Sequence, residues 1–273
     1  TYECVKLGHA GEGTHLTQDE QESVIRAFVR SWPHWRLSAP KMLVQRPVFS
    51  NYPSHGWLRF GYHNGAPQDR YRVVSETSKL PLILFQYPDN TKAIYSLQTM
   101  LDISAQPGVI AMKSGVRNMR RWHVEIPIIH KQRPELQILT CHDEYLLHTA
   151  FDIDGFLVGC GNIAPELLIQ MIEAGKAKDY ARARQLHDQL LPLTKAVYHR
   201  GSHMEGTVAL KHALVARGIL NHATVRSPLM PLAEGADKEI HAAVQFADLP
   251  KINASKLQSN GSNGTSGSTN GFH

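Results

Sequence analysis

The chain has 273 residues, of which 42% are hydrophobic, and its formal net charge is +5 at pH 7. This size and composition fit one barrel-sized domain or two small ones. No apolar run reaches the roughly 18 residues of a membrane-spanning helix, and the start carries no signal-peptide pattern. Three cysteines argue against a disulfide framework, so we expect a cytoplasmic protein without membrane contact.

The positive charges are scattered along the chain, apart from Arg117, Arg120 and Arg121. These three arginines either touch an acidic ligand or phosphate, or form the solvated face of a helix. Zinc-finger spacing, a Gly-rich phosphate loop and an aromatic RNA-binding motif are all missing from the sequence. We therefore expect no nucleic-acid partner.

Short apolar runs alternate with helical patterns along the chain. The predicted strands cover residues 3–8, 80–87, 108–113, 136–141 and 155–158. The predicted helices cover residues 17–32, 96–103 and a segment ending near 130, one opened by His142-Asp143, one begun by Pro165, and residues 179–197 and 207–217. This alternation predicts a parallel sheet with right-handed crossovers, in either a (β/α)8 barrel or a doubly wound sheet. In both folds the site lies at the carboxyl ends of the strands.

The segment Val109-Ile110-Ala111-Met112-Lys113 is the most informative of these strand ends. Strand alternation predicts Val109, Ala111 and Lys113 on one face and Ile110 and Met112 on the other. A lysine at the end of an inward face is partly desolvated, which lowers its pKa and frees the amine to attack a carbonyl. The alternative is a lysine that leaves the strand for solvent, and position alone favours this alternative.

Several motifs, taken in order, resemble one family. They are Gly8-His9-Ala10-Gly11-Glu12, Leu84-Phe85-Gln86-Tyr87-Pro88, Ile110-Ala111-Met112-Lys113, Asp154-Gly155-Phe156-Leu157 with Asn162-Ile163-Ala164-Pro165-Glu166, and the helical region from Lys178 to Leu229. They resemble the Gly-[Thr/Ser]-Thr-Gly-Glu loop, the Tyr-Asn-x-Pro motif, the lysine strand, and the last strand and helices of the dihydrodipicolinate synthase / N-acetylneuraminate lyase family. Its members are class I aldolases and related lyases with a (β/α)8 TIM-barrel fold.

The resemblance implies a mechanism. Lys113 would condense with the ketone of pyruvate or another 2-oxo acid, and the protonated imine would serve as the electron sink without a cofactor or metal. Backbone N–H groups near Gly8, Ala10 and Gly11 would hold the substrate carboxylate. Further substrate-binding positions implied or suggested by the strand ends are Phe85, Gln86, His142, Gly159 and Cys160. The resemblance also suggests a homo-oligomer, either a dimer or a tetramer.

The sequence departs from the family at two site positions. Phe85 stands where the family has its proton-relay tyrosine, and Tyr87, two residues on, either takes over that role or is ordinary packing. His9-Ala10 replaces a pair of threonines. His9 either replaces the lost hydroxyl or acts as an acid–base group, and His142 is a similar candidate. These changes favour a divergent 2-oxo acid lyase or hydratase over dihydrodipicolinate synthase itself.

The sequence is also too short in two places for a complete barrel. The family has one strand and helix before the loop that begins here at Gly8. It also needs a strand, a helix and another strand where this chain has the atypical segment 33–51, in which at most Met42 to Gln45 predicts a strand. We therefore expect one incomplete barrel domain over residues 1–251, and a disordered Ser/Gly/Asn-rich tail over residues 252–273.

Three functions remain open at this point. The first is an active Schiff-base lyase that uses Lys113, with Tyr87 and His9 as catalytic partners. The second is an inactive family remnant or misassembled gene product, in which an open sheet would favour aggregation. The third is a metal-dependent aldolase or hydrolase that uses His9, Glu12 and His142.

Overall fold

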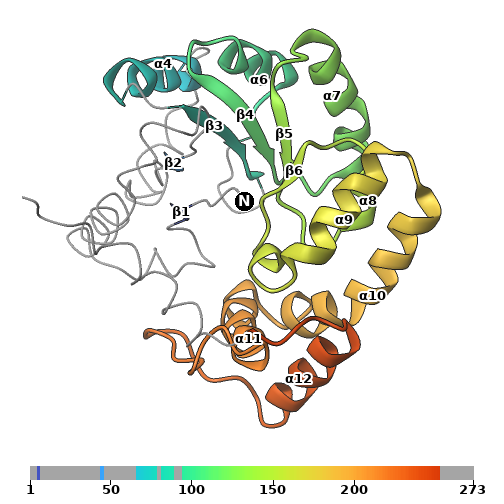
Figure 1. The fold of residues 1–273 in the computed structure, drawn as a ribbon. Helices are drawn as coiled ribbons and strands as arrows, with labels where there is room; N and C mark the ends of the chain where they lie inside the picture. Colours follow the sequence, from blue (N-terminus) through green and yellow to red (C-terminus); the bar gives the residue numbers. More distant parts are fainter. Residues whose placement is uncertain (1–4, 7–43, 46–65, 79–80, 89–93, 253–273) are drawn as a thin grey trace, which may run out of the picture.

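The computed structural model describes residues 5–6, 44–45, 66–78, 81–88 and 94–252. The loop at Gly8 to Glu12, the helix expected over residues 17–32 and the tail from residue 253 lie outside these ranges. Within them, strands and helices alternate in the first part and helices alone follow (Figure 1). None of the described helices has the length and apolarity that crossing a membrane requires.

The strands are β1 (Val5–Lys6), β2 (Val44–Gln45), β3 (Leu82–Gln86), β4 (Val109–Ser114), β5 (Gln137–Thr140) and β6 (Gly155–Phe156). The helices are α4 (Ala66–Ser78), α6 (Leu97–Ser104), α7 (Met119–Gln132), α8 (Leu146–Thr149), the 3-10 helix η3 (Gly159–Asn162), α9 (Pro165–Lys176), α10 (Tyr180–Tyr198), α11 (His203–Ala216) and α12 (Ala236–Phe246). Helices α4 and α12 have no counterpart among the elements predicted one by one from the sequence.

All described strand pairs are parallel, as expected from the alternating pattern. β3, β4, β5 and β6 pair in chain order, with helices in the connections. β1 pairs with β2, and β2 lies against β3. The possible strand in the atypical segment is therefore confirmed at Val44–Gln45. Whether the barrel lacks further units stays a prediction, since the segments that bear on it lie outside the described ranges.

One irregularity changes which residues share a face of β4. The pairing of β3 with β4 advances from Leu82↔Val109 to Ile83↔Ala111, so β4 has one extra residue, Ile110, at this point. Such a bulge reverses the alternation on one side of it. Val109 accordingly packs in the same cluster as Met112, and the prediction that it shares a face with Lys113 is wrong. Beyond the bulge, Ala111 and Lys113 alternate with Met112 as predicted.

Most helix starts follow from local capping chemistry. The Ser96 side chain accepts a hydrogen bond from the Thr99 N–H and begins α6, and Asp179 does the same for α10. Pro165 occupies the first turn of α9, where its missing N–H leaves no bond unmade. Helix α8 departs from its prediction, because it starts at Leu146 rather than at His142-Asp143. The Asp143 carboxylate binds η3 instead of capping α8.

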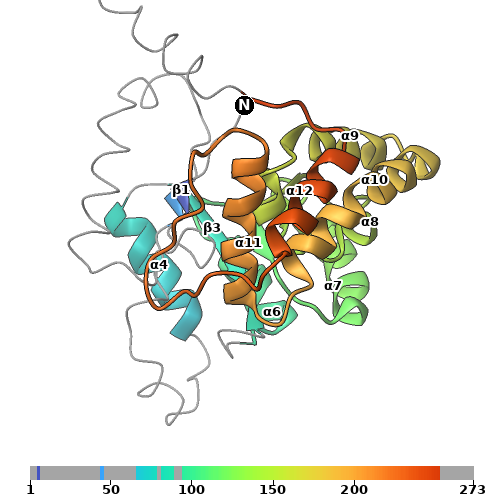
Figure 2. The same cartoon turned by 90° about the horizontal axis from the view of Figure 1, so that it is seen from below.

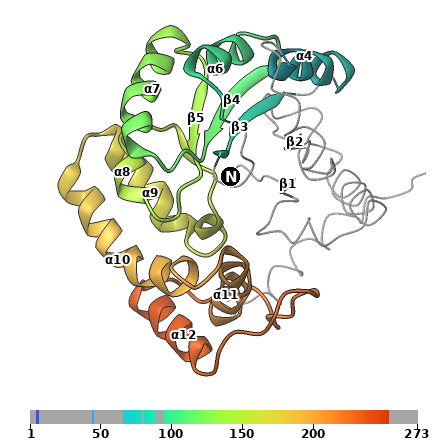
Figure 3. The ribbon, with the colours of Figure 1, turned by 180° about the vertical axis from the view of Figure 1, so that it is seen from behind.

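A first apolar core lies between the sheet and helices α4, α6 and α7, which cover one of its faces (Figures 1 and 3). Leu84, Met112 and Ile138 point from three adjacent strands into this layer and meet Trp122 and Ile126 of α7. Each of these side chains is almost fully buried. Burial of a large apolar side chain stabilises the folded state by about 1.5–3 kcal/mol. This face of the sheet is therefore held against the helices, and the opposite face is the one left for the site.

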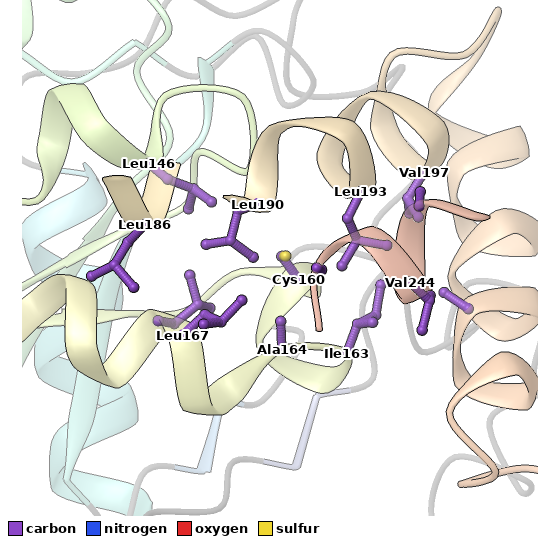
Figure 4. Close-up of a cluster of buried hydrophobic side chains, with 14 of the residues drawn as sticks. Leu146, Cys160, Ile163, Ala164, Leu167, Leu186, Leu190, Leu193, Val197 and Val244 are labelled. Atoms are coloured by element: carbon purple, nitrogen blue, oxygen red, sulfur yellow. The ribbon is translucent and has the colours of Figure 1, made fainter. Parts of the chain in front are cut away.

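The second apolar core is helical and joins α8 to α12 (Figure 2). Leucines of α10 point toward η3 and α9, and Cys160 and Ile163 point back toward them (Figure 4). Val244 of α12 closes the cluster at one end. This core ties the strand ends near β6 to the long helix α10, so the site is held by both cores.

Candidate active site

Lys113 lies near the carboxyl end of β4, on the face of the sheet opposite the first core, which we call the inner face. Its register partners are Phe85 on β3 and Leu139 on β5. The lysine side chain is 0% exposed, so the alternative of a lysine that leaves the strand for solvent is wrong. Its Nζ atom lies 4.3 Å from the centroid of the Phe85 ring. A cation over an aromatic face is attracted by the ring quadrupole, and more strongly where water is excluded.

Phe85 and Tyr87 extend this arrangement along β3 and just beyond it. The two rings stack with centroids 5.4 Å apart and planes 19° apart. Both side chains lie on the inner face because they are two residues apart in an extended segment. The structure thus brings Lys113, Phe85 and Tyr87 together, as the sequence suggested, and Phe85 separates the lysine from the phenol ring.

Arg117 and Glu144 surround Tyr87 on its other side. The Arg117 guanidinium lies 5.2 Å from the centroid of the Tyr87 ring, and its Nε–H donates to Glu144 Oε1 at 2.5 Å. Burial raises the pKa of Tyr87, and the charge and hydrogen bond of Arg117 oppose that rise only in part. The phenol therefore stays protonated at neutral pH and can donate a hydrogen bond.

His142 and Gln86 do not lie with Lys113. The His142 ring packs edge-on against Trp122 of α7 and Tyr145, with centroids 5.3 and 5.7 Å away, and its Nδ1 lies 3.0 Å from Thr140 Oγ1. Gln86 Oε1 accepts a hydrogen bond from the Tyr95 N–H. Both side chains are buried and pack toward the helix-covered face, as strand alternation requires for His142, which is three residues beyond Leu139. Their role in substrate binding stays a prediction.

Burial also keeps His142 neutral. Desolvation lowers its pKa from 6.5 to about 4, although Glu144 opposes this effect. The neutral imidazole lies between two aromatic rings and a threonine hydroxyl, and it is close enough to Arg117 and Glu144 for their charges to act on it.

Gly159 and Cys160 lie at the start of η3, beyond β6. Their N–H groups donate to the two carboxylate oxygens of Asp143, at 3.2 and 2.7 Å. The Cys160 side chain is 0% exposed within the helical core, and burial raises the pKa of its thiol. Gly159 lies so close to Tyr198 that an added Cβ would meet the tyrosine hydroxyl at 1.8 Å. The Cys160 side chain therefore packs in the helical core and Gly159 packs against Tyr198, while a substrate contact at this turn stays a prediction.

The remaining sequence candidates, Gly8, His9, Ala10 and Gly11, lie outside the described residues. The same is true of Glu12, one of the three residues of the metal-site alternative. The third, His142, is packed under α7. Within the described ranges, no three His, Cys, Asp or Glu side chains gather as metal ligands would.

Comparisons with known proteins identify the family of this chain. The family model described as the dihydrodipicolinate synthetase family matches residues 64–247. The chain belongs to this family. It is 28% identical over 262 residues to the 4-hydroxy-tetrahydrodipicolinate synthase of Neisseria meningitidis serogroup C, covering 88% of this chain and 85% of the relative.

Solved structures of the family share the fold. Dihydrodipicolinate synthase from Bacteroides thetaiotaomicron is 22% identical with a TM-score of 0.73, covering 89% of this chain and 86% of that one. A prophage protein of the family from E. coli K12, solved in complex with pyruvate, is 18% identical with a TM-score of 0.70, covering 89% and 86% of the two chains. The expected fold of (β/α)8-barrel type and the expected membership in a family of Schiff-base lyases are both confirmed.

Sequence reasoning missed three polar residues beside the inner face. Arg117 was grouped with Arg120 and Arg121 as either a ligand contact or a solvated helix face, but it precedes α7 and is only 31% exposed. Glu144, and Tyr198 of α10, were not singled out. Glu144 lies four residues after the end of β5, which was a usable signal, whereas no local pattern reveals that Tyr198 reaches Gly159 from a distant helix.

Proposed function

We propose that the protein is a Schiff-base lyase that acts on pyruvate or another 2-oxo acid through Lys113. The observation that carries the proposal is a fully buried lysine on the inner face near the carboxyl end of its strand. The family assignment supports it, and so does the pyruvate in the similar prophage protein. The carboxylate contacts expected at Gly8 to Gly11 are part of the proposal.

The chemistry begins with attack of the neutral Lys113 amine on the ketone carbon, which forms a carbinolamine. The carbinolamine oxygen takes up a proton and leaves as water, while the nitrogen keeps one proton, so the product is a protonated imine. That cation then accepts the electron pair from a bond at the neighbouring carbon, which allows a carbon–carbon or carbon–oxygen bond to break or form. The Phe85 ring, 4.3 Å from Nζ, favours a positive charge at this position.

The proton transfers need a group other than Phe85, because a phenyl ring carries no exchangeable proton. Tyr87 is the nearest tyrosine on the same strand face and its phenol is held protonated. We assign the proton relay to Tyr87. His9 remains a second candidate, since nothing in the described residues bears on it.

Trapping the imine tests the proposal directly. The protein is incubated with pyruvate or with a panel of other 2-oxo acids, reduced with borohydride and mapped by peptide mass spectrometry. We expect a reduced adduct on Lys113, lost in Lys113→Ala and kept in Lys131→Ala, a control at an exposed lysine of α7. A soluble, cooperatively folding sample that forms no adduct with any member of the panel would refute the proposal and favour the inactive remnant. Loss of activity in a chelator would instead favour the metal-dependent alternative.

We also propose that the protein works in the cytoplasm as a homo-oligomer. The two cysteines in the described part of the chain, Cys141 and Cys160, are both free thiols, which suits a reducing compartment. One solved structure with a similar fold is of a monomeric dihydrodipicolinate synthase variant, so the assembly of this chain has to be measured. Light scattering coupled to size exclusion would report the mass, and a monomer at micromolar concentration would refute the oligomer.

A further inference from the structure

A column of stacked groups rises from Lys113 toward the carboxyl ends of the strands. The Lys113 amino group lies over the Phe85 ring, Phe85 stacks on Tyr87, and the Arg117 guanidinium lies over Tyr87. The column therefore begins with the lysine nitrogen and ends with the guanidinium, and two aromatic rings lie between. Glu144 binds the guanidinium through its carboxylate.

Three separate strand ends build the outer part of this column. Tyr87 directly follows β3, Arg117 follows β4 by three residues, and Glu144 follows β5 by four. The Arg117 and Glu144 side chains are only 31% and 24% exposed. A half-buried ion pair of this kind is screened less than a surface pair, so it can hold the arginine over the ring.

Gly115 allows the ring to lie where Arg117 reaches it. A Cβ at residue 115 would lie 2.7 Å from Tyr87 Cδ2, and the Gly115 N–H donates to the Gln86 carbonyl at 2.7 Å. The glycine thus lets the chain after β4 pass close against the chain after β3. That passage brings Arg117 over the phenol ring.

Arg117 also hydrogen-bonds to Tyr87 and acts on it by its charge. A cation beside a buried phenol favours the phenolate that forms when the phenol gives up its proton. Arg117 therefore has two means of influence on Tyr87, one geometric and one electrostatic. Nothing comparable acts on Phe85, which has no proton to give.

We propose that Arg117, held by Glu144, is a positioning residue that aims the Tyr87 hydroxyl at the carbinolamine formed on Lys113. It thereby restores the proton relay that a phenylalanine at position 85 removes. The inference rests on the proposed function. Tyr87 donates its proton to the carbinolamine oxygen, which leaves as water, and the resulting phenolate recovers a proton from the methyl carbon next to the imine. The enamine forms in that step, and Tyr87 ends as it began.

A double-mutant cycle tests this coupling. The variants are Arg117→Gln, Tyr87→Phe and the two together, and the readouts are steady-state deuterium exchange at the pyruvate methyl group by NMR and borohydride trapping on Lys113. We expect Arg117→Gln to slow exchange about 10- to 100-fold at saturating pyruvate, with a small change in KM. In the Tyr87→Phe background, the same substitution is expected to change the rate less than about twofold.

Two further variants sharpen the interpretation. Glu144→Gln weakens the hold on Arg117, so it should slow exchange in the same direction but less, and again only when Tyr87 is present. Arg184→Gln removes the arginine of an exposed pair with Asp188 on α10, 2.9 Å long, and should leave exchange unchanged. If Arg117→Gln does not fold, the double-mutant cycle is measured with Glu144→Gln and Tyr87→Phe instead.

The outcomes separate the inference from the function on which it rests. An adduct on Lys113 together with equal effects of Arg117→Gln in both backgrounds would overturn the positioning role and leave the lyase proposal intact. An effect on KM alone would do the same, because it would mark Arg117 as a binding group. Failure of the unaltered protein to form any adduct would overturn both.

Discussion

Gly159→Ala should destabilise the protein, and a second substitution should repair much of the damage. In the structure, the added Cβ would lie 1.8 Å from the Tyr198 hydroxyl oxygen, 2.9 Å from Cζ and 3.4 Å from Cε1. Because Tyr198 belongs to a helix whose leucines fill the second core, its ring cannot move away freely. Overpacking of this kind costs about 1–3 kcal/mol, and we expect the upper half of that range.

Tyr198→Phe removes the atom responsible for the shortest contact. Its hydroxyl has no hydrogen-bond partner among the described residues, so its loss alone should be close to neutral or slightly stabilising. The double variant should recover at least about 1 kcal/mol of the loss from Gly159→Ala. Urea unfolding would measure these free energies, and thermal unfolding should show a shift of about 2–4 °C per kcal/mol.

Gly161→Ala is the matched control, since it lies in the same 3-10 helix and an added Cβ meets nothing nearer than Leu168 Cδ1 at 3.8 Å. A Gly159→Ala protein as stable as the original, or one not rescued by Tyr198→Phe, would refute the packing argument. Normal stability combined with lost imine formation would show instead that substrate, rather than Tyr198, requires the glycine at 159.

Two more predictions concern stability. His142 has a pKa of about 4 in the folded protein against 6.5 unfolded, so the unfolded state binds an extra proton between these pH values. The free energy of unfolding should therefore fall by up to about 3 kcal/mol as the pH drops from 6.5 to 4. In urea titrations at several pH values, His142→Asn should make the free energy of unfolding depend less on pH. His123→Asn, at an exposed position of α7, should leave that pH dependence unchanged. An equal pH dependence in the His142→Asn variant and the unaltered protein would contradict the prediction. Arg217 is 0% exposed and donates hydrogen bonds to Glu166 and to two backbone carbonyls. Arg217→Met should therefore lower the free energy of unfolding by about 3 kcal/mol. A change below about 1 kcal/mol would show that these hydrogen bonds contribute little to stability.

The parts of the fold that sequence predicts well are those decided by neighbouring residues. Ser96 and Asp179 cap their helices because a side-chain oxygen reaches an N–H three residues on. Pro165 marks a first turn for an equally local reason. The strands around Lys113 were predicted because their apolar runs are short and closed by turn residues.

The errors arise where a distant partner competes with a local preference. Asp143 could cap α8, yet its carboxylate accepts from the N–H groups of residues 159 and 160. Val109 changes face because β4 carries one more residue than β3 at that point. The sequence of β4 alone does not show how many residues β3 places opposite it, and the sequence around Asp143 does not show that residues 159 and 160 lie nearby. The same limit applies to Arg117, whose burial depends on residues about thirty positions away on both sides.

The arrangement around Lys113 shows why one lost hydroxyl does not by itself argue for lost activity. The register partner of the lysine is Phe85, so a ring without a proton lies directly beside the amine. The next residue on the same strand face is Tyr87, one layer nearer the carboxyl ends, where Arg117 and Glu144 reach it. Imine formation requires the amine in the lower layer, and proton transfer requires a hydroxyl that a bound substrate can reach. In the proposed function, a substrate attached to Lys113 extends toward the carboxyl ends of the strands, so a donor in the upper layer meets its oxygen. The phenylalanine at position 85 would then move the relay by one layer and keep the lysine in place.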